Sequence, residues 1–247
     1  MSESIERERS TTGPRRAYVD VLELLLERLR GSWYPPGSRL PAERALADEL
    51  GVSRPTVREA LAALELMGVV DTHVGAGTYV REPAGDGPIA GGETEFGASP
   101  SEVLQVRLML EPSTARLAAA NWDRQSLGAI ARPLRNLQRL AEAQSSTHPT
   151  KEDRQFHTAI ARATHNTMLI GLLGPLWEAM SQSLWRALKS RGWTAAHTAG
   201  VAREHAEIYE AIRSRDGDLA SFQMEKHIRG VIASLYESGD GDRSPRG

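Results

Sequence analysis

The chain has 247 residues, of which 40% are hydrophobic and 25% are charged, which is an ordinary globular composition with room for two domains. It contains no cysteine, which excludes disulfides, thiolate metal ligands and cysteine nucleophiles, so a metal site would need histidine and carboxylate ligands. The net charge is −2, and residues 33–81 carry five arginines against six acids, so bulk charge gives no indication of a nucleic-acid partner.

The N-terminal segment, residues 1–16, is polar and mixed in charge, with no periodic apolar pattern. This composition predicts a disordered tail, and it lacks the apolar core of a secretory signal peptide. No apolar run in the chain approaches the roughly 18 residues that a helix needs to cross a bilayer. We therefore expect a cytoplasmic protein.

Residues 17–82 are predicted to form a winged helix-turn-helix domain. Apolar residues recur at helical spacing over 18–29. Next comes a short helix at 42–50, a tight turn beginning at Gly51, and a second helix for which Ser53 is the expected cap. Two helices joined by such a short turn are typical of DNA-binding proteins.

Basic side chains are expected to lie on one face of this domain. Arg54 and Arg58 are one turn apart near the start of the second helix, so both can project toward a major groove, and Arg44 can reach the same duplex. The following residues alternate around a turn that contains Gly75, as in a two-stranded hairpin whose tip could meet the minor groove. Each arginine alone is equally typical of a solvated helix face, but the combination predicts DNA binding.

The stretch LPAERALADELGVSRPTVREAL, followed by a G-x-G-x-Y-V wing, closely resembles the DNA-binding domain of the GntR family of bacterial transcriptional regulators. The resemblance implies that DNA is contacted by Arg44, Arg54, Thr56, Arg58 and Gly75. Thr56 would contact a phosphate, and Gly75 would bring the wing backbone close to the duplex. Ala76 departs from the pattern, because many members have a basic residue there, so insertion of the wing into the minor groove is not implied.

A change in composition separates this domain from the rest of the chain. Eight of the eighteen residues from 83 to 100 are glycine or proline, which predicts a flexible linker at 83–98. From 99 to 237 the apolar spacing predicts helices and no convincing strand, and residues 238–247 are expected to be a disordered tail. The first helix is expected at about 99–110, and Pro112 is expected to break or kink it. Further helices are expected at 124–143, 151–163, 167–189, 199–214 and 219–237.

Three of the seven histidines have positions that are compatible with a metal site. Asp153 and His157 are four residues apart on one predicted helix, so their Cβ atoms lie about 5 to 6 Å apart on one face. His205 and His227 fall on two other predicted helices and share their faces with apolar residues, so both could point into the core of a bundle. The sequence permits these side chains to converge, but it is equally compatible with separate packed histidines.

Residues 99–236 resemble the all-helical FCD effector domain of the FadR-type branch of the GntR family. The ordered pattern of that domain is matched by Arg107 with Glu111, Asp153 with His157, His205 and His227. The resemblance implies a divalent metal ion bound by Asp153, His157, His205 and His227, and a small organic acid as effector. Three imidazoles and one carboxylate suit zinc, nickel, manganese or iron, and the residues do not select among them. The expected fold is mainly α, a winged helix-turn-helix domain followed by an antiparallel helical bundle.

Four protein ligands leave two positions open on a six-coordinate ion, which a small carboxylate or hydroxycarboxylate could fill. Arg107 is a candidate for binding the negative charge of this effector through a bidentate fork, and an intrahelical pair with Glu111 is the equal alternative.

The predicted function is a ligand-responsive transcriptional regulator, most often a repressor in this family, that binds a pseudo-palindromic operator as a homodimer. The first alternative is the same regulator with a metal-free pocket. The second is a metal-dependent enzyme attached to a DNA-binding domain. Glu204, beside His205, is the one further carboxylate near the proposed ligands, and no general base is evident, so we do not expect an enzyme.

Overall fold

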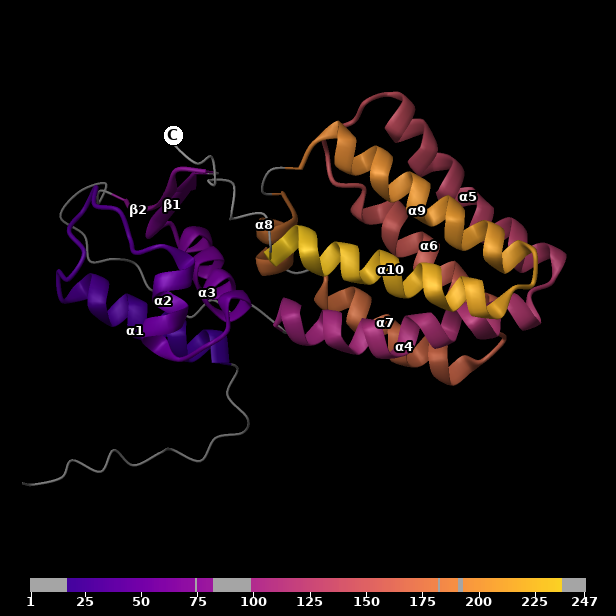
Figure 1. Cartoon of the computed structure of the whole chain (residues 1–247), viewed down its shortest axis with the longest axis horizontal. Coiled ribbons are helices and arrows are strands. Elements are labelled where there is room, and N and C mark those ends of the chain that lie inside the picture. Colours follow the sequence, from indigo (N-terminus) through magenta and orange to yellow (C-terminus); the bar gives the residue numbers. More distant parts are fainter. Residues whose placement is uncertain (1–16, 74, 82–98, 182, 191–192, 237–247) are drawn as a thin grey trace, which may run out of the picture.

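The computed structural model describes residues 17–73, 75–81, 99–181, 183–190 and 193–236. The predicted tails at 1–16 and 238–247 and the predicted linker at 83–98 lie outside the described residues. The described chain forms a small winged unit, at the left of Figure 1, and a bundle of long helices at its right. No helix among the described residues is long and apolar enough to span a membrane.

The N-terminal unit consists of three helices and a hairpin: α1 (Ala17–Arg30), α2 (Glu43–Leu50), α3 (Arg54–Leu66), β1 (Val70–His73) and β2 (Gly77–Val80). The turn between α2 and α3 begins at Gly51, whose φ of 65° is a left-handed conformation that glycine adopts without a Cβ clash. Ser53 caps α3, because its hydroxyl oxygen accepts a hydrogen bond from the backbone N–H of Thr56 at 3.3 Å. Both features agree with the sequence prediction.

The predicted wing is a two-stranded antiparallel hairpin. Val70 lies opposite Val80, and His73 lies opposite Gly77. The N–H of Ala76 donates to the carbonyl oxygen of His73 at 3.0 Å and closes the turn. The helix-turn-helix unit with its wing is therefore confirmed.

The C-terminal half is a bundle of helices, and its described residues contain no strand. Its helices are α4 (Pro100–Asn121), α5 (Arg124–Glu142), α6 (Thr150–Ala163), α7 (Thr167–Ala179), α8 (Ser183–Ser190), α9 (Ala195–Arg213) and α10 (Gly217–Tyr236). Helices α4 and α10 pack side by side, while α5 packs against α6 and α9 (Figure 1). The mainly α fold class is confirmed.

Two helix boundaries differ from the prediction. Helix α4 does not end near Pro112 but continues through this buried proline to Asn121, because its packing against α10 supports the turn that lacks a proline N–H. The helix predicted over 167–189 is divided into α7 and α8. The hydroxyl of Ser181 donates to the backbone carbonyl of Glu178 at 2.6 Å, a local bond that competes with continuation of the helix.

Helix α3 also connects the N-terminal unit to the bundle. Its Glu59 accepts hydrogen bonds from the hydroxyl of Ser99 and from the backbone N–H of Ser101, both at 2.8 Å. These two residues form the start of α4, where a carboxylate is favoured by the helix dipole. Helices α8 and α10 also pack against α3, so α3 contacts three helices of the bundle.

Candidate metal centre and nucleic-acid interface

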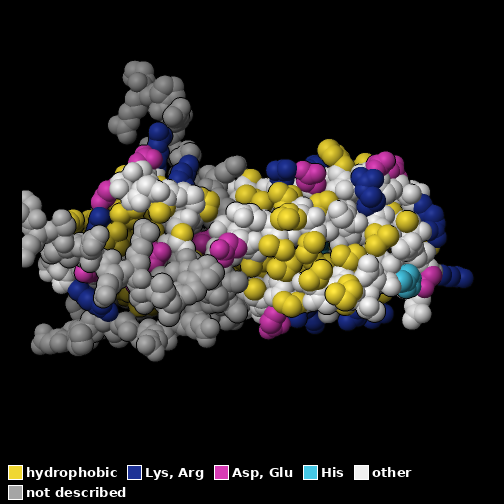
Figure 2. Space-filling model, turned by 90° about the horizontal axis from the view of Figure 1, so that it is seen from below, with side chains coloured by type: hydrophobic (Ala, Val, Ile, Leu, Met, Phe, Trp, Pro, Cys, Tyr) yellow, Lys and Arg dark blue, Asp and Glu magenta, His cyan; other side chains and the backbone are white. Residues whose placement is uncertain are grey.

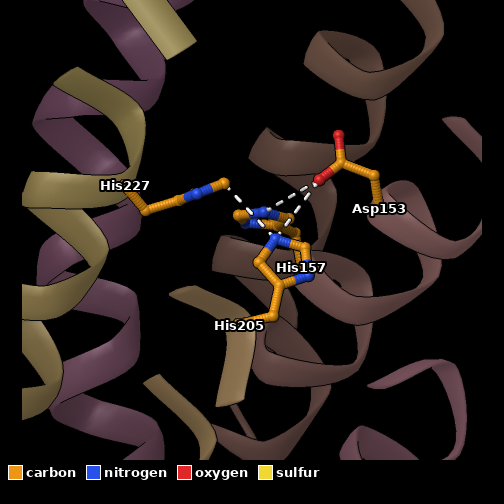
Figure 3. Close-up of side chains that lie close together, drawn as sticks. All are labelled: Asp153, His157, His205 and His227. Carbon is orange, nitrogen blue, oxygen red and sulfur yellow. Dashed lines mark hydrogen bonds and ion pairs between the residues drawn. The ribbon is translucent and has the colours of Figure 1, made fainter. Parts of the chain in front are cut away.

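Four potential metal ligands converge in the core of the bundle (Figure 3). Asp153 and His157 come from α6, His205 from α9 and His227 from α10. One ligand atom of each lies within 4.8 Å of those of the other three, and none of the four residues is more than 5% exposed. Tertiary packing therefore brings together the four residues that the sequence pattern indicated.

The ligand atoms face a common point. One carboxylate oxygen of Asp153, Oδ1, lies 3.5 Å from Nε2 of His157 and 3.4 Å from Nε2 of His205. The Nε2 atoms of His205 and His227 are 3.4 Å apart. The ring of Phe156 stacks on the imidazole of His205 with a centroid distance of 4.2 Å. The convergent atoms are therefore one carboxylate oxygen and three equivalent imidazole nitrogens.

Two further carboxylates lie against the opposite nitrogens of these rings. Glu204 has an oxygen 2.8 Å from Nδ1 of His227, and an oxygen of Glu111 contacts Nδ1 of His157. A carboxylate that accepts the Nδ1 proton leaves the Nε2 lone pair available to a metal. The sequence carries no signal of this role of Glu204, because the residue that it contacts lies on a different helix.

Arg107 and Glu111 form a buried ion pair on α4. Nε of Arg107 donates to Oε1 of Glu111 at 2.6 Å, and the guanidinium carbon lies 4.4 Å from the ring centre of Trp177. Burial alone would raise the pKa of Glu111, but the charges of Arg107 and His157 lower it to about 2. The structure thus has the intrahelical pair, one of the two alternatives that the sequence left open for Arg107.

Lys189 of α8 is a buried cation that the sequence analysis did not identify. It is 7% exposed, and its Nζ lies 3.3 Å from the second carboxylate oxygen of Asp153, Oδ2. Burial would raise the pKa of Asp153, but Lys189 and the neighbouring imidazoles hold it well below the usual value. A single basic residue in a sequence carries no signal of such a pairing, which only the packing of α8 against the bundle creates.

The donor set fits a divalent metal ion. Burial lowers the pKa of His205 to about 3 and also lowers the pKa of His227, so both rings are neutral near pH 7. Burial would also lower the pKa of His157, but Glu111 and Asp153 raise it, so this ring would release its proton when a metal binds. Nδ1 of His205 has no hydrogen-bond partner among the described residues. A bound ion would supply a Lewis-acid centre that can hold an oxygen ligand.

Four of the five predicted DNA-contacting residues have at least partly accessible positions. The Arg44 side chain is 76% exposed, and Gly75 is exposed at the turn of the wing, with a left-handed φ of 76°. Arg54 and Thr56 are half-buried in the first turn of α3, and the Thr56 hydroxyl lies 2.7 Å from that of Ser53.

Arg58 is positioned differently from the prediction. It is only 6% exposed, forms an ion pair with Glu43 of α2, and donates from Nη1 to the backbone carbonyl of Leu235 at 2.6 Å. The expectation that this side chain projects outward is therefore wrong for this conformation. The physical reason is that the end of α10 covers the start of α3, which single-helix geometry cannot reveal.

Comparison with known proteins gives the following matches. The family model "Bacterial regulatory proteins, gntR family" matches residues 17–80, and the FCD domain model matches residues 102–230. The Uxu operon transcriptional regulator of Escherichia coli K12 is 33% identical over 239 residues, which cover 95% of this chain and 92% of that protein. The HTH-type transcriptional repressor NanR of Klebsiella aerogenes is 29% identical, over 92% and 88% of the two chains.

A solved structure, E. coli McbR/YncC, has a TM-score of 0.50 and 22% sequence identity, over 91% of this chain and 99% of that one. At this identity the likeness concerns the fold alone. It agrees with the winged unit and helical bundle described above.

Removal of the buried carboxylate at position 111 is expected to destabilise the bundle strongly. Glu111→Ala leaves the Arg107 charge uncompensated, so the free energy of unfolding should fall by about 3 to 5 kcal/mol. Urea denaturation followed by circular dichroism measures this, with the exposed Gln105→Ala on the same helix as control. The double variant Arg107→Met/Glu111→Leu should recover much of the loss. A Glu111→Ala variant as stable as Gln105→Ala would contradict the buried ion pair.

Proposed function

Because the chain belongs to the gntR family of bacterial regulatory proteins and carries an FCD domain, we propose that it is a repressor that binds a pseudo-palindromic operator as a homodimer and senses a small organic acid at a metal-containing pocket. That it is a ligand-responsive transcriptional regulator rather than an enzyme follows from its families and relatives. The observation that carries the finer proposal is the convergence of three imidazoles and one carboxylate in its effector half. The direction of regulation is supported by the NanR relative, which is named a repressor. Since its partner is bacterial operator DNA, we place the protein in the cytoplasm.

The metal pocket is proposed to consist of Asp153, His157, His205 and His227, with zinc, nickel, manganese or iron as the ion. Support comes from the facing Nε2 atoms and from the carboxylates that hold two of the opposite ring nitrogens. A small carboxylate or hydroxycarboxylate would complete the coordination of the ion. The alternative is a pocket that binds its effector without a metal.

Metal content distinguishes these two pockets. Protein purified without chelators should contain about one equivalent of metal per chain by elemental analysis, and His157→Ala and His205→Ala should lose it. His73→Ala, which changes an exposed histidine of the wing, is the matched control. Glu204→Ala should bind metal roughly 10- to 100-fold more weakly, because the ring of His227 loses its orienting partner. Equal metal in wild type, His157→Ala and His205→Ala would contradict the site.

DNA recognition is proposed to use Arg44, Arg54, Thr56, Arg58 and Gly75. The first turn of α3 supports this, because an N-terminal turn that enters a major groove brings its side chains to the base edges. Arg58 would have to exchange its bonds to Glu43 and Leu235 for contacts with DNA.

Arg54→Ala should weaken operator binding by about 1 to 3 kcal/mol if its guanidinium reads a base edge. Fluorescence anisotropy with a DNA site selected from random sequences by the wild-type protein measures this. Arg139→Ala removes the same charge from the exposed face of α5 and serves as control. The proposal for Arg54 fails if its variant binds as tightly as this control.

The homodimer is proposed to form through an apolar face on α4 and α7. Figure 2 shows hydrophobic side chains gathered over the bundle when it is seen from below. Exposed members on these two adjacent helices are Val106, Met109, Met168 and Leu172. Exposed apolar side chains that gather on one face are typical of protein–protein interfaces.

Charges placed on this face should dissociate the dimer. We expect Met109→Glu and Met168→Glu to sediment as monomers at micromolar concentration, because a carboxylate would lose its hydration in the interface. Leu24→Glu, on the exposed side of α1, should leave the dimer intact. Dimers of unchanged stability in both methionine variants would exclude this face.

The contacts of Glu59 with the start of α4 provide a connection between the two functions. Helix α4 carries Arg107 and Glu111, and Glu111 contacts His157 of the proposed metal site. A shift of α4 on effector binding would therefore act directly on the recognition helix α3. Coupling energies of this kind are typically about 1 to 3 kcal/mol, enough to change operator occupancy substantially.

A further inference from the structure

An acidic effector needs a cation in its pocket, and Arg107, the candidate from the sequence, shares its charge with Glu111 while its Nη1 has no hydrogen-bond partner among the described residues. Its guanidinium is fully buried, is bonded to Glu111 and lies over Trp177. In the described part of the chain, one cavity lies beside Asp153 and His227 and another lies along α5, α6 and α7, and Arg107 is in the wall of neither. A second cation of the bundle, Lys189, does line them.

Lys189 lies between these cavities. The first, of about 760 Å³, opens between the N-terminal unit and the bundle and has Asp153 and His227 in its wall. The second, of about 940 Å³, lies against α5, α6 and α7, with Trp177 and Trp185 in its wall. Lys189 is in the wall of both, but only the first cavity also has proposed metal ligands in its wall, so a molecule that reaches Asp153 and His227 through the first cavity passes Lys189.

The carboxyl group of Asp153 sets the distance between the ammonium group and the imidazoles. Its Oδ1 faces Nε2 of His157 and of His205, at 3.5 and 3.4 Å, while its Oδ2 lies 3.3 Å from Nζ of Lys189. The ammonium group of Lys189 and the imidazole nitrogens are therefore separated by the width of one carboxyl group. A single short carboxylate or hydroxycarboxylate can reach both.

The charges of the site favour an added anion. Arg107 balances Glu111, and Lys189 balances Asp153, so a divalent ion among the imidazoles would add two positive charges. Glu204 can offset only one of them. An uncompensated charge in a buried site is costly, and an ion on Oδ1 would also compete with Lys189 for the negative charge of Asp153.

We propose that Lys189 is an effector-binding residue, whose ammonium group donates to a carboxylate oxygen of the acid while another oxygen of the acid binds the metal ion. This inference rests on the metal-containing pocket of the proposed function. It also gives the acid a direct connection to DNA binding, because Lys189 belongs to α8, which packs against the recognition helix α3. The acid would therefore bind a residue of the same short helix, α8, that packs against α3.

The test uses the full chain loaded with cobalt(II), whose visible spectrum reports changes in its coordination. Wild type, Lys189→Met, Lys189→Arg and Lys151→Met are each titrated with acetate and with glycolate. Lys151 is an exposed lysine of α6 that lines the second cavity, so it is a matched control for loss of charge. Lys189→Met should raise the dissociation constant of the acids roughly 10- to 100-fold, as expected for loss of a charge-assisted hydrogen bond. Lys189→Arg should restore part of the affinity, and Lys151→Met should match wild type.

Cobalt content, measured on the same samples, separates the two proposals. Wild type that takes up no cobalt would overturn the metal pocket and this inference with it. Wild type and Lys189→Met that both hold cobalt and bind the acids equally would overturn the role of Lys189 alone. If neither acid altered the spectrum of cobalt-loaded wild type, binding of these acids at the metal would be overturned, and the role of Lys189 with it. Circular dichroism verifies folding, and Lys189→Gln replaces Lys189→Met in the titration if the methionine variant is unfolded.

Discussion

The buried charges of the helical bundle are the constraint on which the rest of the structure depends. Arg107 and Glu111 on α4, Asp153 on α6 and Lys189 on α8 are all nearly inaccessible to water. Such groups are tolerated only where each has a partner. Arg107 pairs with Glu111 within α4, while the contacts of Glu111 with His157 and of Lys189 with Asp153 link different helices. Since Glu111 also contacts His157, the position of that imidazole depends on the pairing of Arg107. The contacts that provide partners for these buried charges therefore also orient the groups proposed to bind the metal.

Helix α3 is also bonded to the helical bundle. Helix α3 supplies side chains predicted to contact DNA, yet Glu59 bonds to the start of α4 and Arg58 bonds to the end of α10. Operator binding and the effector half therefore share structural elements. A movement of the bundle that broke one of these charge-assisted hydrogen bonds would change the energy by about 1.5 to 3 kcal/mol, which is the scale of typical allosteric coupling.

The local elements were largely predictable, because they depend on short-range periodicity and on capping chemistry. Ser53 and Gly51 marked the boundary between α2 and α3, and the glycines of the wing marked the hairpin turn. The errors occurred where packing overrides local preference. Pro112 lies inside a continuous helix that packs along α10, although proline by itself favours a break or kink there.

The sequence by itself determined the fold class, the winged helix-turn-helix and the four candidate metal ligands, because spacing within helices and an ordered family pattern are properties of the chain. The tertiary structure decided which atoms meet. It placed the three Nε2 atoms and Oδ1 of Asp153 around one point, gave His227 its partner Glu204, and buried Lys189 beside Asp153. It also enclosed Arg58 beneath α10. These contacts join residues on different helices, and a linear sequence carries no record of how far apart such helices pack or which faces they present to each other.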